Sequence, residues 1–433
     1  MSTSSMTDPD LMLRFMLQVL VVLATCSAVG WFGHKYLGQA QVTMEMLTGV
    51  ILGPSVFGAL SPPVQQALFP PFMVAGSPTS GKHPSMTVLY VVGQIGIILY
   101  IFLIGLDFDL NVIKSRSKQT IAVSVAGILG PILLGMVVFY TILNSRTDLF
   151  GAGISPSIQA LFVASAMSIT AFPMLARIID EAGIKGSPLG TLIIGAGASN
   201  DVFAWALLAI VLAITKGNPM IAVFAIGGSI VFSALLISQK EMLFGFLDRR
   251  EPADGISPST ISIILLLLFL GAWCTDSIGV HALFGSFLVG VAIPRGRLGK
   301  LLREKIEPLT ISFFLPFFFV YSGLNTQIGS LEKSEHWILA ILLLLAAVVG
   351  KIGGCFLAAK ACGETVRTAT GIGVLMNTRG LMELIVLNIG LQQKIITPTF
   401  FTMMVIMAIV TTFMAAPLFR MVYKGGRGEP KPS

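Results

Sequence analysis

Two adjacent polar residues, Asn200 and Asp201, interrupt an apolar stretch that runs from Gly186 to Ile214. A carboxylate about halfway across a lipid bilayer is costly unless it faces water, an ion or a partner group, so by default it marks an ion or proton pathway. The sequence therefore predicts that Asp201 lies on such a pathway, and that this acid is the centre of the chemistry.

The composition indicates a protein whose solvent is lipid. Of the residues, 55% are hydrophobic and 11% are charged, and the mean hydropathy is +0.87. Soluble domains carry about 25% charged residues, so a soluble enzyme is excluded. The first ten residues contain no Lys or Arg and lack the basic region of a cleaved signal peptide. We expect the first apolar segment to remain as a membrane span.

Thirteen apolar segments are long enough to span a membrane when about 20 residues are taken for each span. They predict an all-α polytopic membrane protein with about 13 transmembrane helices. The segments cover residues 13–32, 43–60, 87–106, 119–143, 157–177, 189–215, 219–238, 257–275, 279–294, 306–323, 336–359, 368–390 and 397–419.

The distribution of Lys and Arg predicts the orientation of the chain. An odd number of spans separates the two ends, and the loops then divide into one set with 20 basic residues and another with six. Because the basic excess lies on the cytoplasmic side, we expect an external tail at 1–12, a cytoplasmic tail at 420–433 and a multi-pass protein of the cell (inner) membrane. Only Lys351 and Arg379 then lie inside the bilayer.

Two of the segments are interrupted near their middle. The fifth reads SAMSITAFPMLARIIDEAG, in which Thr170 and Pro173 break an apolar helix, since proline removes a backbone donor and clashes with the preceding turn. A plain proline kink is the alternative explanation. The twelfth reads GIGVLMNTRGLMELIVLNIG, and a kink alone does not explain an arginine at mid-depth. Its interrupting residues are Asn377, Thr378, Arg379 and Gly380.

The two interrupted segments are seven apart, so they cross the membrane in opposite directions. Irregular backbone at this depth is tolerated only where protein or a water-filled cavity surrounds it. Two such segments at matching positions of inverted halves are the best sequence indication of a transporter's binding site. We therefore expect inverted repeats with two crossed discontinuous helices, and the span after the first break carries Asn200 and Asp201.

Three further charged residues are predicted close to this site. Lys351 lies about fifteen residues from the start of its segment and nine from Lys360, too deep for a lysine that snorkels to the surface. Arg379 is expected to offset the negative carboxyl end of a half-helix, with Glu383 one turn later as a partner for Arg379 or Lys351. The alternatives are structural: a lysine that neutralises helix ends or a carboxylate, and a simple Arg379–Glu383 pair.

Seven strings of the sequence resemble the monovalent cation:proton antiporters, in particular the bacterial Na+/H+ and K+/H+ exchangers and their plant relatives. They occur in the family's order between residues 38 and 390. The strings are GQAQVTMEMLTGVILGPSVFG, LIGLDFDL, SITAFPMLARI, GASNDVFAWALLA, GVHALFGSFLVGVAIPR, LPFFFVYSGLNT and MNTRGLMELIVLNIG.

The resemblance implies a fold and a way of moving. It implies a core built around the two unwound helices, from spans at about 119–215 and 336–419, and a dimerisation or scaffold part at about 13–106 and 257–323, all within a membrane domain at 13–419. Transport would be an elevator-like movement of the core within a homodimer. Regulatory domains like those of potassium-efflux members would be separate chains.

The resemblance also implies the site residues. Asp201 would bind cation and proton in alternation, and Lys351 would be the charged residue that faces it. Oxygen ligands for a desolvated Na+ or K+ could come from Asp201, Asn200, Thr170 and free carbonyls of the breaks. No cofactor is implied, only the transported ions, and no nucleic acid partner. The supporting residues are Lys351, Asn377, Thr378, Arg379, Glu383 and Pro173.

Two departures from the family pattern leave the stoichiometry open. Electrogenic members resemble this chain but have Asp where Asn200 stands, and many electroneutral members with the Asn–Asp pair have Arg at the position of Lys351. Counting carboxylates favours electroneutral exchange, because Asn200 cannot titrate. A cation channel and a proton-coupled symporter of the same fold are the alternative functions. A membrane aspartyl protease is disfavoured, since it needs two facing acids.

Overall fold

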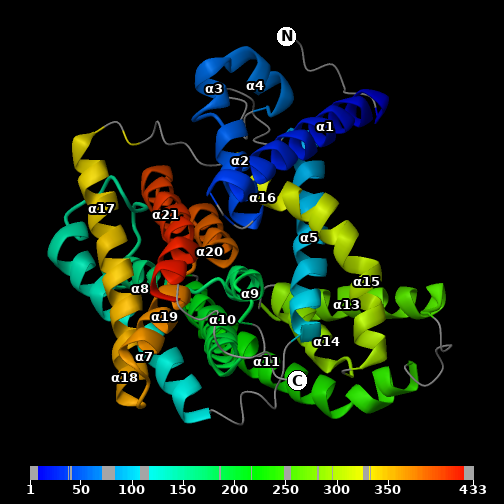
Figure 1. Cartoon of the computed structure of the whole chain (residues 1–433). Coiled ribbons are helices and arrows are strands. Elements are labelled where there is room, and N and C mark those ends of the chain that lie inside the picture. The colour runs from blue at the N-terminus through cyan, green and yellow to red at the C-terminus, as the bar shows by residue number, and fades with distance from the viewer. Residues whose placement is uncertain are drawn as a thin grey trace.

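The computed structural model describes residues 8–423 except 38, 40, 71–82, 108–116, 185–186, 216, 248–254, 280–281, 295, 325–330 and 332. Within these ranges the named elements are all helices, and the only pairing of β type is an isolated bridge between Phe150 and Ile396 (Figure 1). Eight helical stretches of the described chain are long and apolar enough to cross a membrane. The predicted all-α polytopic membrane protein is confirmed.

Each predicted span coincides with one helix or with consecutive helices, whereas thirteen as the number of crossings stays a prediction. One group of helices fills the left side of Figure 1 and surrounds the interrupted segments. It consists of α7 (Ser117–Val138), α8 (Pro156–Ser168), α9 (Phe172–Glu181), α10 (Pro188–Thr215), α17 (Ser334–Val348), α18 (Gly354–Ala361), α19 (Val366–Met376), α20 (Leu381–Gln392) and α21 (Pro398–Tyr423).

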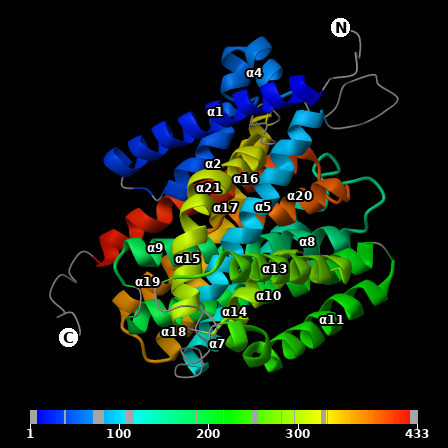
Figure 2. The ribbon, with the colours of Figure 1, turned by 90° about the vertical axis from the view of Figure 1, so that its right-hand side faces the viewer.

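A second group lies to the right in Figure 1 and faces the viewer in Figure 2. The helix α11 (Pro219–Ser238) follows α10 and also contacts the second group, and the short helices α3 (Phe57–Leu60) and α4 (Pro62–Leu68) lie beyond α2. The second group consists of α1 (Asp8–Phe32), α2 (Gln41–Leu52), α5 (Pro84–Asp107), α13 (Pro258–Ser277), α14 (Ala282–Ala292), α15 (Arg297–Leu309) and α16 (Leu315–Leu324).

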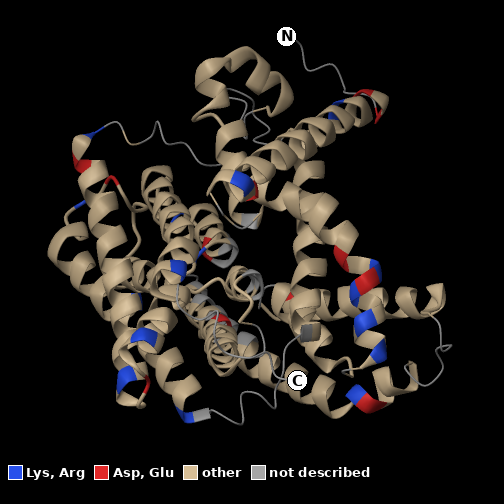
Figure 3. Ribbon diagram, viewed as in Figure 1, with Lys and Arg blue, Asp and Glu red and all other residues tan. Residues whose placement is uncertain are grey.

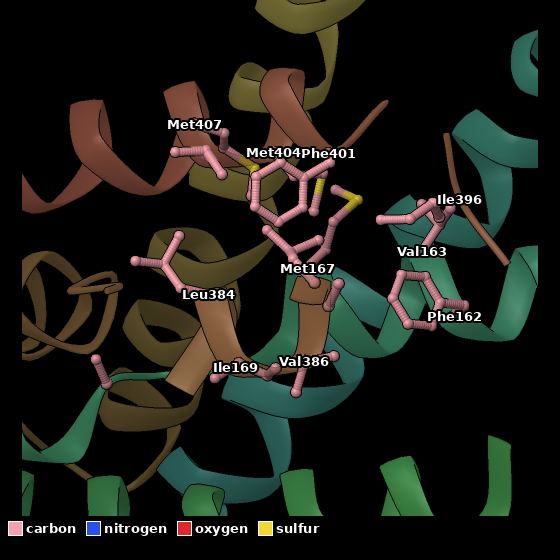
Figure 4. Close-up of a cluster of buried hydrophobic side chains, with 14 of the residues drawn as sticks. Phe162, Val163, Met167, Ile169, Leu384, Val386, Ile396, Phe401, Met404 and Met407 are labelled. Carbon is pink, nitrogen blue, oxygen red and sulfur yellow. The ribbon is translucent and has the colours of Figure 1, made fainter. Parts of the chain in front are cut away.

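The largest cluster of buried apolar side chains joins the two groups, because it contains residues of α5, α14 and α16 as well as α8, α9 and α21. Around the interrupted helices, Phe401, Met404 and Met407 of α21 gather near Met167 of α8 (Figure 4). Leu384 of α20 belongs to the same cluster. The breaks therefore lie inside packed protein, the condition under which irregular backbone is tolerated at membrane depth.

Glycines let α7 pack with its backbone against the backbone of the chain that follows α17 and continues into α18. Between these two helices the chain forms a π-helical turn, η6 (Val349–Gly353). A Cβ atom added to Gly130 would lie 2.3 Å from the carbonyl oxygen of Gly350, and one added to Gly354 would lie 2.6 Å from the oxygen of Ala126. Small residues of this kind allow close helix contacts in membranes, and here they fix α7 against the helix that carries Lys351.

The loop after α7 is tied to the start of α17 by two side-chain contacts. Arg146 Nη1 lies 2.5 Å from Glu335 Oε2, and Asp148 Oδ2 lies 3.1 Å from His336 Nε2. Glu335 and His336 are both at the start of α17. Partial burial raises the pKa of Asp148, but the hydrogen bond with His336 and nearby positive charge outweigh it, and the pKa is below its ordinary value. This loop is thus held to α17 by an ion pair and a hydrogen bond.

Charged side chains are concentrated away from the middle of the helices, as expected for a membrane protein. Lys and Arg are prominent on α15 and at the lower ends of α7 and α18, whereas the central parts of most helices carry few charges (Figure 3). The division of the basic residues between the two sides of the membrane, and with it the orientation of the chain, stays a prediction.

Replacing Gly130 by alanine should separate α7 from η6, because the added Cβ would meet a backbone oxygen that cannot move aside. We expect a loss of about 1–3 kcal/mol, as for other overpacked sites, measured as a lower Tm of the purified protein in detergent. Gly353→Ala is the matched control, since nothing lies within 4 Å of a Cβ at Gly353. Equal Tm values for the two variants would contradict the close contact.

Candidate functional site

The first interruption separates α8 from α9 and is bonded directly to the second. The helix α8 ends at Ser168, and α9 begins at Phe172. In between, the backbone N–H of Ala171 donates to the carbonyl of Thr378 at 2.9 Å. The hydroxyl of Thr170 donates to the carbonyl of Met376 at 3.1 Å. Each break thus satisfies polar backbone groups of the other.

Pro173 does not itself form the break. It is the second residue of α9, a position in the first helical turn where the missing backbone donor costs little; its side chain lies outside the described part. The interruption consists of Ile169, Thr170 and Ala171. The predicted break is present, and the proline marks where the second half-helix begins.

The second interruption separates α19 from α20. The helix α19 ends at Met376, and α20 begins at Leu381. Gly380 has a φ of 152°, which side chains rarely adopt. The carbonyl of Arg379 lies 2.5 Å from the hydroxyl of Thr412 on α21. The helix α21 thus supplies a hydrogen-bond donor for a backbone carbonyl of the break. The hydroxyl of Thr378 donates to Leu375 O at 2.7 Å.

Two buried cations satisfy the carboxyl end of α8. Arg379 donates through Nη1 to the carbonyl of Ala166 at 3.2 Å and through Nη2 to that of Met167. Lys351 Nζ donates to the carbonyl of Ser168 at 2.5 Å. Both side chains have 0% exposure. The last carbonyls of a helix lack partners within the helix and carry the negative end of its dipole. Positively charged side chains are therefore stabilised at this end of α8.

Glu383 completes the charges around Arg379. Its Oε1 lies 3.4 Å from Arg379 Nη1, and both side chains are fully buried. The acid stands in the first turn of α20, where the positive end of the helix dipole favours a carboxylate. Glu383 Oε2 is buried without a hydrogen-bond partner among the described residues. The pair therefore links the start of one half-helix to the end of another.

Asp201 lies on α10 at the amino end of the half-helix α9. Its carboxylate accepts a hydrogen bond from the backbone N–H of Phe172, and it interacts electrostatically with Lys351. Oδ1 is buried and has no hydrogen-bond partner among the described residues. Unlike Lys351 and Arg379, the residue as a whole is partly exposed. The acid is thus held at one oxygen and free to bind a proton or a cation at the other.

Asn200 connects Asp201's helix to Lys351, Thr170 and α7. In the amide orientation that turns an oxygen toward the ammonium of Lys351, Oδ1 lies 3.1 Å from Lys351 Nζ and 3.2 Å from Thr170 Oγ1. The amide nitrogen then donates to Ser124 Oγ at 2.6 Å and to the carbonyl of Ser124 at 3.1 Å. Asn200 is 1% exposed. The amide therefore joins the first break and Lys351 to α7.

The predicted site residues come together around the two breaks. Asn377 is also buried there, with Oδ1 lacking a hydrogen-bond partner among the described residues. Sequence reasoning missed Ser124, Thr412 and the Phe172 amide. A hydroxyl in an apolar span gives a weak signal, because it can bond to a carbonyl of its own helix. No group of three or more His, Cys, Asp or Glu that could hold a metal ion occurs in the described chain.

An all-helical membrane protein in which two interrupted helices meet at buried charges has the architecture of a secondary transporter. The family described as "Sodium/hydrogen exchanger, transmembrane" matches residues 20–424. The chain belongs to this family, and it is accordingly a transporter and not an enzyme.

Several characterised proteins are similar to this chain over nearly its whole length. The Na(+)/H(+) antiporter NhaS4 of Synechocystis is 34% identical over 419 residues, which are 96% of this chain and 98% of the relative. Cation/H(+) antiporter 17 of Arabidopsis thaliana is 35% identical, and K(+)/H(+) antiporter 1 of Saccharomyces cerevisiae is 32% identical, over 96% and 94% of this chain. The matched regions are 49% and 46% of those two longer proteins.

A solved structure supports the fold. The sodium proton antiporter MjNhaP1 from Methanocaldococcus jannaschii, solved at pH 8, aligns with a TM-score of 0.65 over 97% of this chain and 100% of that chain. The sequences are 16% identical, so the comparison concerns the arrangement of helices alone.

Removing the charge of Arg379 should destabilise the protein strongly, because Glu383 and two carbonyls of α8 would lose their cation. We expect Arg379→Met to cost about 3–5 kcal/mol, as for other broken buried pairs, measured by thermal unfolding in detergent. The double variant Arg379→Met/Glu383→Met should be more stable than the single one. Arg420→Met, at an exposed arginine in the last turn of α21, is the control. A single variant as stable as this control would contradict the assigned role.

Proposed function

We propose that this protein is a cation/proton antiporter that exchanges Na+ or K+ for H+ at Asp201. The sodium, potassium and cation antiporters among its relatives support this function. The observation that carries the proposal is the state of Asp201. It is a carboxylate beside the two breaks, with one oxygen bonded to a helix amino end and the other without a hydrogen-bond partner in the described part of the chain.

Exchange follows from competition for that carboxylate. A proton and a monovalent cation each neutralise one negative charge, so Asp201 binds one or the other. A bare Na+ or K+ would find further oxygen atoms on Thr170 and Asn200, which lie beside each other. A site that moves across the membrane only when Asp201 is neutralised must return a proton for each cation that it carries.

The surrounding charges keep the site close to neutral without taking part in binding. Lys351 and Arg379 compensate the carboxyl end of α8, and Glu383 compensates Arg379. Lys351 also acts electrostatically on Asp201. We propose that Lys351 supports the site in this way and does not carry the transported proton. Asn377 and Thr378 are proposed as supporting residues of the second break. The proposal requires no cofactor.

Movement would involve the helices that carry the breaks. In the proposed mechanism α7–α10 and α17–α21 form a core that slides like an elevator against α1, α2, α5 and α13–α16. The second group would be the scaffold through which two copies form a homodimer. We further propose that the N-terminus is external and the C-terminus cytoplasmic, in the cell membrane, on the basis of the distribution of Lys and Arg.

The central experiment is reconstitution of the purified protein into vesicles that contain a pH-sensitive dye. Na+, K+, Li+ and Rb+ are added in turn, and an antiporter should release protons from the cation-free lumen of acid-loaded vesicles. Asp201→Asn should fold, since it removes a partly buried charge, yet lose this proton movement. Asp276→Asn, at an exposed aspartate in the last turn of α13, is the matched control. Near-normal exchange by Asp201→Asn at equal protein levels would refute the assignment of Asp201.

We also predict electroneutral one-for-one exchange, because Asn200 cannot titrate and Asp201 alone can give one proton. The test imposes a membrane potential with valinomycin and a K+ gradient while Na+-driven proton flux is followed. The same vesicles with equal K+ on both sides are the control. A substantial change in flux with potential would mean that net charge moves. Loss of that dependence in Lys351→Gln would then identify the lysine as a second proton carrier.

A further inference from the structure

Ser124, on α7, contacts the site through the amide nitrogen of Asn200 and belongs neither to a break nor to the helix of Asp201. Its hydroxyl and its carbonyl both accept from the amide nitrogen of Asn200, at 2.6 and 3.1 Å. Ser124 is 1% exposed. Both N–H groups of the amide thus have partners on α7, and the oxygen of the amide is left for the site.

The orientation of this amide decides what Asn200 offers to its neighbours. A carboxamide has one acceptor and two donors, and it can rotate by half a turn within the same space. With the oxygen toward the site, Asn200 accepts from Lys351 Nζ and lies beside Thr170 Oγ1, whose hydrogen is donated to Met376 O. With the amide reversed, its N–H groups would face the ammonium of Lys351, and a cation near Asp201 would meet donors in place of an oxygen.

Two groups hold the oxygen of the Asn200 amide toward the site, and they differ in how firmly their own positions are fixed. Lys351 does so through its ammonium, at the end of a flexible side chain. Ser124 does so from a helix whose backbone is packed on η6 through Gly130 and Gly350. An incoming cation that needs the Asn200 oxygen must compete with the ammonium for it. Ser124 does not compete: its carbonyl can only accept, so it holds the amide nitrogen while the ammonium is displaced, and its hydroxyl is a second acceptor for that nitrogen.

We propose that Ser124 is a positioning residue of the exchange site: by accepting from the Asn200 amide, it presents the Asn200 oxygen to the transported monovalent cation. The inference rests on the proposed function, because it concerns how the site of that function binds its cation. It assigns to α7 a direct part in cation affinity that the residues of the breaks alone do not provide.

The experiment compares Ser124→Ala, Ser124→Cys and Ser124→Thr with the wild type. Cysteine keeps the size of serine but accepts hydrogen bonds weakly, whereas threonine retains the hydroxyl. Ser286→Ala on α14 is the matched control, because Ser286 is buried and its hydroxyl donates only within its own helix, to Ala282 O. Two quantities are measured: the KM for Na+ and K+ in vesicles, and the NaCl or KCl concentration that half-saturates thermal stabilisation in detergent, with choline chloride keeping the ionic strength constant.

Ser124→Ala and Ser124→Cys should each raise the KM and the half-saturating concentration about fivefold, the effect of roughly one net hydrogen bond. The maximal rate should change less than twofold, and the Tm without Na+ or K+ should match that of Ser286→Ala. Ser124→Thr should stay within about twofold of the wild type. The thermal titration reports cation binding separately from transport.

Two results would overturn the inference in different ways. If the wild type exchanges cations but the alanine and cysteine variants bind them with unchanged half-saturation, Ser124 only fills space and the positioning role is wrong. If the wild type neither exchanges nor is stabilised by Na+ or K+, the proposed function fails first and the inference fails with it.

Discussion

The carboxyl end of α8 is the feature on which the site depends. A helix that stops within apolar protein leaves carbonyls that water cannot reach, and each must find a donor or destabilise the fold. Here Arg379 and Lys351 supply the donors for Ala166, Met167 and Ser168. Their charges in turn require compensation nearby, which accounts for Glu383 and is consistent with the presence of Asp201.

The two interruptions behave as one unit because each satisfies the other. Ala171 donates to Thr378, Thr170 donates to Met376, and Arg379 reaches back to the end of α8. Neither half-helix could shift alone without leaving buried polar groups unpaired. The arrangement therefore couples the paired helices rigidly, while Asp201 on α10 beside them is partly exposed.

Much of this arrangement could be predicted from the sequence, because polar residues are rare within membrane spans and therefore informative. Asp201, Lys351, Arg379 and the two breaks were recognisable for that reason. The role of Ser124 was not, since a serine in an apolar span can bond to its own helix and its partner depends on tertiary packing. Nor could the sequence reveal that Pro173 follows the break, or that the Asn200 amide joins Lys351 to α7, since both depend on backbone and rotamer geometry.

The π-helical turn at Val349–Gly353 has a consequence for the length of its helix. A π turn contains one residue more than an α-helical turn, so the continuous helix from α17 to α18 holds an extra residue that leaves its flanks undisturbed. Deleting one residue there would restore a regular helix and rotate Lys351 by about 100° relative to one of the flanks. If two related chains differ by one residue in this helix, the lysine side chain therefore points in a different direction in each. A gap in the alignment of such chains belongs within Val349–Gly353 and not in the neighbouring loops.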